Sequence, residues 1–302
     1  FSEGLRTAIA GTVNSIADQC DGVRCDMAML MMNDIFQRTW GDRAGAMPVG
    51  EYWPELIGAV RAAHPGFLFM AEAYWDLEWA LQQQGFDFCY DKKLYDRMEH
   101  GPAENVRLHL CADRAYQEGM VRFIENHDEP RAAATFEDGK ARAAAVATLT
   151  LTGAKLLHEG QFEGRKVRLP VFLGRRPAEP GDQELSVFYK KLLKETGRDL
   201  FRNGDWRLCE RSGWPDNQSC QNILTWCWVK DGERSLVLVN FSDVTSQALL
   251  KVPWDEVREK MWRLEDSLSG ETFVRSGDDM RDAGLYVELT PWQYHLFKVL
   301  AV

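Results

Sequence analysis

The first 196 residues alternate between helical patterns and short apolar runs. Apolar residues recur at helical spacing over 5–19 and 51–63. Helices are also expected over 77–84 and 185–193 and over the alanine-rich segment 140–152, and a helix-rich stretch ends near 118. Five apolar runs between these segments predict strands over 22–26, 67–71, 86–90, 120–124 and 154–157. Apolar strands without polar alternation are typical of parallel sheets covered on both faces. We therefore expect an α/β domain over residues 1–196.

The pattern changes after Gly197, where helical periodicity is absent. Strands are expected over 222–229, 235–241, 247–252 and 284–290, and Asp231-Gly232 predicts a hairpin turn. We therefore expect a separate antiparallel β domain over 197–302. Seven of the 11 tryptophans lie in it, and a core role is favoured over sugar stacking because tryptophan is mostly well buried.

Composition narrows the class of protein. The chain has 302 residues, of which 45% are hydrophobic and 27% are charged, and this composition is typical of a globular protein. A net charge of −10 argues against nucleic acid as a partner. The longest apolar run, over 27–32, is too short to cross a bilayer, and we see no signal-peptide pattern at the start. Seven scattered cysteines without a CxxC pair argue against a closed disulfide set and against zinc, and favour a reducing compartment such as the cytoplasm.

Three of the apolar strands are followed by an acidic residue. These are Asp26 after GVRC, Glu72 after FLFMA and Asp128 after the run MVRFIENH. Each alone is explained by a helix cap or a solvated loop. In a parallel α/β fold, however, the carboxyl ends of the strands meet at one edge, where active sites lie. Three in series therefore predict a shared site.

The neighbours of these carboxylates suggest different roles for them. Arg24 points to the same side of its strand as Asp26, and a guanidinium favours the ionised form that a nucleophile needs. A structural ion pair is the alternative. Glu72 follows an apolar run, and partial desolvation favours the protonated form that a general acid needs. A charged and a protonated carboxylate together are the apparatus of glycoside hydrolysis, and a separation of about 5–5.5 Å indicates the retaining mechanism.

Other side chains beside the carboxylates are candidates for substrate binding. Tyr74 and Trp75 follow Glu72 closely and are suited to stacking on sugar rings, although core packing explains them equally well. His127, between Asn126 and Asp128, is placed to donate a hydrogen bond to a ligand hydroxyl, although a lone histidine is more often structural.

Several segments together resemble the α-amylase family of glycoside hydrolases, which combines a (β/α)8 barrel with a C-terminal β-sandwich. Residues 22–26 (GVRCD) resemble the fourth-strand segment G-x-R-x-D, 69–72 (FMAE) the fifth-strand segment and 123–128 (FIENHD) the seventh-strand F-x-x-N-H-D. Residues 153–160 (GAKLLHEG) resemble the eighth-strand segment, and the ending LTPWQYHLFKV resembles the family's last strand.

The resemblance implies a role for each site residue. Asp26 would be the nucleophile, Glu72 the acid/base and Asp128 the stabiliser of the transition state. Arg24 would be the partner of Asp26. Asn126 and His127, from the N-H-D segment, would contact substrate. No cofactor and no metal are implied by these residues.

Departures from the family pattern limit what it implies. Met29 and Leu30 occupy positions where many α-amylases have a Lys-His pair, so sugar recognition on the leaving-group side is expected to differ. Lys155 stands where proline is usual. The visible strands correspond to strands four to eight, and neither strands one to three nor the calcium-associated inserted domain is recognisable. A closed barrel needs eight strands and about 250 residues, so we expect a partial barrel completed by a second copy, another polypeptide or a longer parent chain.

The sequence thus predicts a retaining glycoside hydrolase or glucanotransferase acting on α-linked glucosides, such as maltooligosaccharides or α-glucan. The main alternative is a non-catalytic carbohydrate-binding remnant, or a fragment that needs a second chain. A generic α/β enzyme of other chemistry, such as an isomerase, does not explain the N-H-D segment.

Overall fold

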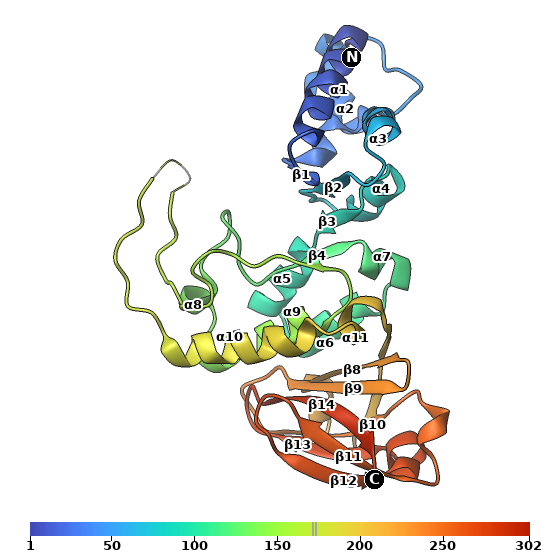
Figure 1. Cartoon of the computed structure of the whole chain (residues 1–302), viewed down its shortest axis with the longest axis vertical. Helices are drawn as coiled ribbons and strands as arrows, with labels where there is room; N and C mark the ends of the chain where they lie inside the picture. The colour runs from blue at the N-terminus through green and yellow to red at the C-terminus, as the bar shows by residue number, and fades with distance from the viewer. Residues whose placement is uncertain (171, 173) are drawn as a thin grey trace. The chain divides into compact units, whose positions relative to one another are not determined.

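The computed structural model describes residues 1–170, 172 and 174–302. Five short strands form a parallel sheet in the order β1 (Gly22–Cys25), β2 (Leu68–Ala71), β3 (Phe88–Tyr90), β4 (Met120–Arg122) and β5 (Ala154–Lys155) (Figure 1). Each strand lies where the sequence predicts one. β3, β4 and β5 are each two residues shorter than expected, because β3 begins at Phe88, β4 ends at Arg122 and β5 ends at Lys155. The Arg122 carbonyl accepts from the Leu156 N–H at 2.9 Å.

The predicted helices are present between these strands. They are α1 (Glu3–Ala17), α3 (Tyr52–Ala63), α4 (Glu78–Gln83), α5 (Lys92–His100), α6 (Ala103–Leu110), α7 (Arg114–Glu118), α9 (Asp138–Thr150) and α10 (Gln183–Thr196). Three further helices were not expected: α2 (Asn33–Trp40), α8 (Ala132–Thr135) and α11 (Leu200–Asn203). They are short or polar, so they carry little helical periodicity. The short turns η1 (Ala28–Met31), η2 (Gly41–Ala44), η3 (Ser219–Asn222), η4 (Asp255–Val257) and η5 (Asp279–Ala283) complete the set.

The chain divides into two compact units. The first consists of Phe1–Lys92 and Asp113–Val121, and the second of Lys93–Ala112 and Arg122–Val302. The first unit has its own apolar core, in which β2 and β3 pack against α3 and α4 through Phe69, Phe86, Leu56 and Leu81. The side chains of α1 lie only partly buried against this core.

The second unit holds two antiparallel sheets. One has the order β13 (Leu285–Leu289), β10 (Ser246–Lys251), β7 (Glu210–Ser212). The other has the order β12 (Thr272–Ser276), β11 (Met261–Asp266), β14 (Tyr294–Ala301), β9 (Glu233–Asn240), β8 (Ile223–Lys230), β6 (Asp205–Leu208) (Figure 1). Asp231 and Gly232 both have positive φ, 48° and 84°, and join β8 to β9 as the predicted two-residue turn. The predicted β-sandwich is therefore confirmed.

Contacts tie the sandwich to the helices that precede it in the second unit. Trp228 Nε1 of β8 donates to the Thr150 carbonyl at the end of α9, at 2.8 Å. Lys298 Nζ of β14 lies 3.0 Å from the Glu195 carboxylate of α10. The compact unit therefore extends across residue 197, and the predicted boundary between 1–196 and 197–302 stays a prediction.

Most tryptophans of the β domain are buried. Trp254 and Trp262 lie in the core of the domain, as the core interpretation predicts. Trp206, Trp226 and Trp228 are buried outside that core cluster, and Trp228 contacts Thr150 of α9 and Phe201 of α11. Trp214 and Trp292 are the two that are only partly buried.

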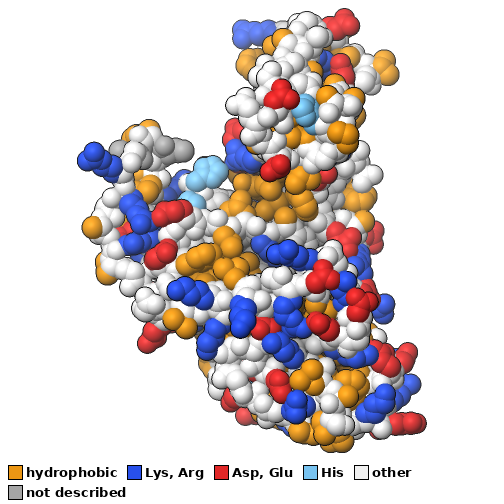
Figure 2. Space-filling model, viewed as in Figure 1, with side chains coloured by type: hydrophobic (Ala, Val, Ile, Leu, Met, Phe, Trp, Pro, Cys, Tyr) orange, Lys and Arg blue, Asp and Glu red, His pale blue; other side chains and the backbone are white. Residues whose placement is uncertain are grey.

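The surface carries mixed charge. On the face shown in Figure 2, lysine and arginine side chains are interspersed with aspartate and glutamate. Over the described residues, every helix is too short or too polar to pass through a lipid bilayer.

Candidate active site

Asp26 and Glu72 follow the last residues of two neighbouring parallel strands. Cys25 at the end of β1 is paired in register with Ala71 at the end of β2. The ladder continues one step further, because the Glu72 N–H donates to the Cys25 carbonyl at 3.0 Å. Both carboxylates therefore leave the sheet at its carboxyl edge, where α/β proteins bind ligands.

The Arg24 guanidinium lies between these two carboxylates. Its Nη1 pairs with Asp26 Oδ1, and its Nη2 lies 3.0 Å from Glu72 Oε2. The Arg24 Cζ lies 5.5 Å from the centroid of the Tyr90 ring. Burial lowers the pKa of Arg24, but the hydrogen bond to Asp26 and the charge of Glu72 outweigh burial and raise the pKa overall. A permanent cation thus holds Asp26 and Glu72 on adjacent nitrogens of one guanidinium.

Glu72 is held by donors on both carboxylate oxygens. The Met27 N–H donates to Oε2 at 2.7 Å, and the Tyr74 hydroxyl donates to Oε1 at 3.0 Å. Met27 has φ of 42°, in the left-handed region, and this turn aims its N–H at Glu72. The Glu72 side chain is only 6% exposed, so its position is fixed by the surrounding structure.

Asp26 has the opposite environment, because its side chain is 77% exposed. An exposed carboxylate beside a buried one gives an incoming ligand access to the first while the second is held in place. Trp75 is 60% exposed and has φ of 63°, so the core-packing alternative does not describe it. Tyr74 is partly buried and serves as a hydrogen-bond donor to Glu72.

The N-H-D segment forms a second cluster, after β4. Asn126 is buried, and its Oδ1 accepts from the backbone N–H groups of Asp128 and Glu129 at 2.8 and 2.9 Å. This turn presents His127 and Asp128 to solvent, with His127 Nε2 3.0 Å from Asp128 Oδ2. The Asn126 oxygen therefore shapes the loop, which is a role that the sequence did not indicate.

The structure thus brings the predicted residues together in two groups. Arg24, Asp26, Glu72 and Tyr74 are in contact within the first compact unit, where Trp75 also lies. The N-H-D residues belong to the second unit. The meeting of Asp128 with the other two carboxylates stays a prediction.

Comparison with known proteins gives a relative by sequence. The α-amylase MalA of Haloarcula japonica is 30% identical over 285 residues, which cover 91% of this chain and 38% of MalA. No family model matches the chain.

Solved structures give the fold. A maltogenic α-amylase, AmyB from Thermotoga neapolitana, matches 100% of this chain and 66% of its own with a TM-score of 0.75 at 18% identity. A debranching enzyme from Nostoc punctiforme matches 98% of this chain and 61% of its own, with a TM-score of 0.69 at 15% identity. The chain is similar in sequence to an α-amylase and similar in fold to these enzymes. The predicted resemblance is therefore confirmed, and the chain spans 38% of the length of the curated relative it matches.

The departure from the α-amylase pattern after Asp26 has a structural counterpart. Met29 and Leu30 lie in the short turn η1, where Met29 is fully buried in the core and Leu30 partly so. These positions therefore pack against the protein, and Met29 has no surface with which to contact a sugar.

A buried ionic cluster beside the N-H-D turn was not foreseen from the sequence. Glu125 accepts from the Ala132 N–H at 2.7 Å, and its other oxygen lies 3.2 Å from both Arg131 Nη1 and His158 Nδ1. Burial raises the pKa of Glu125 to about 7, although Ala132 and Arg131 oppose the rise. Burial and the charge of Arg131 lower the pKa of His158. The cluster fixes the loop after β4 against the loop after β5.

One group with the composition of a metal site occurs among the described residues, far along the chain in the β domain. It consists of Asp266, Glu271 and His295. Asp266 Oδ2 already accepts from His295 Nδ1 and the Ser269 hydroxyl, both at 2.8 Å, and Oδ1 accepts from the Leu268 N–H at 3.0 Å. Asp266 thus serves as the acceptor for a turn and a histidine within the fold.

Proposed function

We propose that the protein is a retaining glycosidase or glucanotransferase that acts on α-linked glucosides. The observation that carries the proposal is the Arg24 guanidinium, which holds Asp26 and Glu72 together at the carboxyl ends of adjacent parallel strands. Both carboxylates contact one guanidinium, and the retaining mechanism uses two carboxyl groups about 5–5.5 Å apart. Relatives named as α-amylases, a maltogenic amylase and a debranching enzyme support the substrate class.

The reaction divides into two steps. In the first, Glu72 donates its proton to the glycosidic oxygen, and the bond from that oxygen to the anomeric carbon breaks. Asp26 Oδ attacks the anomeric carbon and forms a glycosyl ester, and the leaving sugar departs with the proton. In the second, Glu72 takes a proton from water or a sugar hydroxyl, whose oxygen displaces Asp26. Both carboxyl groups return to their starting states.

The surrounding residues support these steps. Arg24 holds the Asp26 carboxylate in position for attack, and Tyr74 and the Met27 N–H fix the direction of the Glu72 carboxyl group. We assign Asp128 to the hydroxyls of the sugar in the transition state, His127 and Asn126 to the substrate, and Trp75 to stacking on a sugar ring. The geometry needs no organic cofactor for these steps.

Product stereochemistry tests the proposal. Hydrolysis of an aryl α-glucoside, followed by NMR in the first minutes, is expected to release the α-anomer, which mutarotates later. Release of the β-anomer would mean inversion and would contradict the assignment of Asp26. Product lengths from maltooligosaccharides then separate hydrolysis, which shortens the chains, from transfer, which also lengthens them.

A second candidate is a carbohydrate-binding protein without turnover. One observation favours this candidate: Asp128 belongs to a different compact unit from Asp26 and Glu72. Binding of maltooligosaccharide with no hydrolysis of any α-glucoside would establish this candidate over the first.

We also propose that further strands pair with the parallel sheet, from a second copy or from another polypeptide. β1 and β5 are its outer strands among the described residues, and exposed edges favour association. Light scattering is expected to show an assembly larger than one chain; a monomer that unfolds cooperatively would contradict this. The seven free cysteines support a reducing compartment, and we propose the cytoplasm.

A further inference from the structure

Trp214 is one of the two β-domain tryptophans that are only partly buried, and it lies beside an exposed tyrosine. The rings of Trp214 and Tyr286 meet edge to face, with centroids 6.0 Å apart. The Tyr286 side chain is 50% exposed, and Trp214 is partly exposed. Two adjoining aromatic rings on the surface of a domain whose other tryptophans are mostly buried need a reason beyond core packing.

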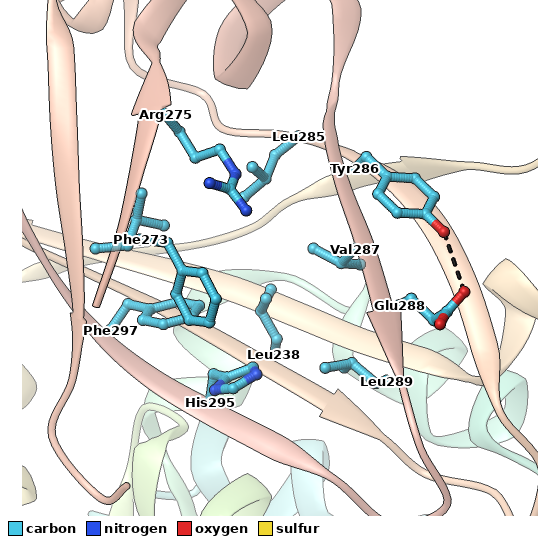
Figure 3. A pocket seen from close by; sticks show the side chains of 11 residues that line it. Leu238, Phe273, Arg275, Leu285, Tyr286, Val287, Glu288, Leu289, His295 and Phe297 are labelled. Atoms are coloured by element: carbon cyan, nitrogen blue, oxygen red, sulfur yellow. Dashed lines mark hydrogen bonds between the residues drawn. The ribbon is translucent and has the colours of Figure 1, made fainter. Parts of the chain in front are cut away.

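Tyr286 belongs to the outer face of the three-stranded sheet, and Trp214 lies two residues after β7, the edge strand of the same sheet. Along β13 the side chains alternate: Leu285 and Leu289 enter the core, whereas Tyr286 and Glu288 face outward. Figure 3 shows the same division, with the Tyr286 phenol and the Glu288 carboxylate together on one side of the strand. Tyr286 and Glu288 also line a pocket of about 240 Å³, most of whose other lining side chains are apolar.

Polar side chains form a connected row beside the rings. Gln247 of β10 is paired in register with Glu288, and its Nε2 donates to Glu288 Oε2 at 2.5 Å. The Tyr286 hydroxyl donates to the same oxygen at 3.2 Å. Asn217 Nδ2 donates to Gln247 Oε1 at 2.8 Å, and Asn217 is itself tied to Trp214 by two backbone hydrogen bonds. The row is therefore held in place before any ligand arrives.

Glu288 has one carboxylate oxygen that can accept a hydrogen bond from a ligand. Both of the donors to Glu288 use Oε2, and within the described part of the chain Oε1 has no hydrogen-bond partner. The amide groups of Gln247 and Asn217 are only partly buried, so they too border solvent. A flat apolar ring surface next to carboxylate and amide groups matches a pyranose, which has a C–H face and a rim of hydroxyls.

The charge of this face distinguishes between classes of ligand. Glu288 repels anions, so a phosphorylated or acidic ligand is disfavoured. Protein interfaces are depleted of charged residues at their centre, whereas here a carboxylate adjoins the rings. A neutral, hydroxyl-rich ligand satisfies both constraints.

We propose that Trp214, Tyr286, Gln247 and Glu288 form a binding surface for a neutral α-glucan chain, separate from the Asp26 site. The location of this surface follows from the β domain alone, whereas the choice of an α-linked glucan rests on the proposed function. A sugar ring stacks on Tyr286 and Trp214, and its hydroxyls donate to Glu288 and accept from the amides. Such a surface would hold a polymer while another part of it is processed.

Affinity electrophoresis in gels that contain glycogen tests the proposal with the chain itself. Glycogen is expected to retard the wild-type chain, and Tyr286→Ala and Trp214→Ala are each expected to weaken binding about tenfold, which corresponds to about 1.4 kcal/mol. Tyr286→Phe keeps the ring and should retain most of the binding. Trp40→Ala removes another exposed tryptophan, 52% exposed in the first unit, and should leave retardation unchanged.

Two results would overturn the inference. One is that the wild-type chain migrates equally with and without glycogen in the gel. The other is that glycogen retards the wild type, Tyr286→Ala and Trp214→Ala equally. Hydrolysis of a small aryl α-glucoside is measured in parallel and should be the same in all these variants. If retardation depends on Tyr286 while the wild type hydrolyses nothing, the proposed catalytic function fails and the binding surface stands.

Discussion

Asp26 and Glu72 show how two residues of one chemical type acquire different tasks. One is mostly exposed and meets a single guanidinium nitrogen, whereas the other is nearly buried and receives donors on both oxygens. The difference arises from local backbone: the left-handed turn at Met27 closes over Glu72 and leaves Asp26 open. Their unequal surroundings distinguish an open carboxylate from a fixed one, whereas the assignment of nucleophile and acid follows from the resemblance to the α-amylases.

Asp26→Asn is expected to reduce hydrolysis of an aryl α-glucoside by about 10³-fold or more, because the neutral amide cannot form the glycosyl ester. The free energy of unfolding should change by less than about 1 kcal/mol, since the side chain is exposed. Asp21→Asn is the matched control: Asp21 is also exposed and lies at the opposite end of β1. Equal turnover of wild type and Asp26→Asn would refute the nucleophile.

Glu125 makes stability depend on pH. Its pKa is raised to about 7 in the folded protein, against about 4.3 when unfolded, so the folded state holds its proton more tightly. The contribution of Glu125 to the free energy of unfolding is therefore largest below about pH 4. It is lost as the pH rises through 7, by up to about 3 kcal/mol. The lowered pKa of His158 acts in the opposite direction.

Urea unfolding at pH 5 and pH 8 checks this prediction. The free energy of unfolding of Glu125→Gln should fall less between the two pH values than that of the wild type. An equal fall in both proteins would show that Glu125 is not the group responsible.

The G-x-R-x-D segment begins with glycine for a steric reason at the level of the strands. A Cβ on Gly22 would lie 2.7 Å from the Leu68 carbonyl oxygen and 2.8 Å from its Cβ. Gly22 is paired with Leu68 at the start of the β1–β2 ladder, which positions Arg24 and both carboxylates further along. The close approach of these two strands therefore requires the absence of a side chain.

Gly22→Ala is expected to destabilise the protein by about 1–3 kcal/mol, because backbone cannot move aside cheaply. Gly58→Ala is its control: Gly58 lies inside α3 with open space around it, so alanine should stabilise the helix by about 0.5–1 kcal/mol. Thermal unfolding of both variants decides the matter, and a neutral Gly22→Ala would contradict the steric account.

The sequence predicted those helices and strands whose apolar residues form a clear pattern. The five parallel strands were located because each is a continuous apolar run, α1, α3 and α10 because their apolar residues recur at helical spacing, and α9 because it is rich in alanine. β11 was missed although it alternates, with Trp262 and Leu264 buried and Met261 and Arg263 exposed, because charged residues dilute so short a strand. α2 was missed because it is short and polar.

The site was predictable where it depends on strand ends and hidden where it depends on distant partners. The contact of Arg24 with Asp26 follows from their spacing of two residues along one strand. The Glu125 cluster joins residues 33 positions apart, and the row from Asn217 to Glu288 joins three segments of the β domain. No local pattern encodes pairings of this kind.

For the molecule as a whole, burial divides the seven cysteines into reactive and protected thiols. All seven are free; Cys20 and Cys111 are exposed, and Cys25 is half-buried with its pKa raised by burial to about 12. The other four are buried and serve as small apolar residues. Thiolate is the reactive form, so burial protects them.

An aromatic disulfide reagent at pH 8 is therefore expected to modify two thiols rapidly in the folded chain and seven after unfolding in urea. Cys20→Ser and Cys111→Ser should each remove one rapid equivalent. Rapid modification of four or more thiols in the native protein would contradict the packing of both compact units.

Trapping of the covalent intermediate tests the central claim most directly. A 5-fluoro-α-glucosyl fluoride forms the glycosyl ester readily and releases it slowly, so the adduct can be located by peptide mass spectrometry. The account predicts a single adduct on Asp26, which disappears in Asp26→Asn. Turnover of the reagent with the adduct on another carboxylate, or with Asp26 unmodified, would contradict it.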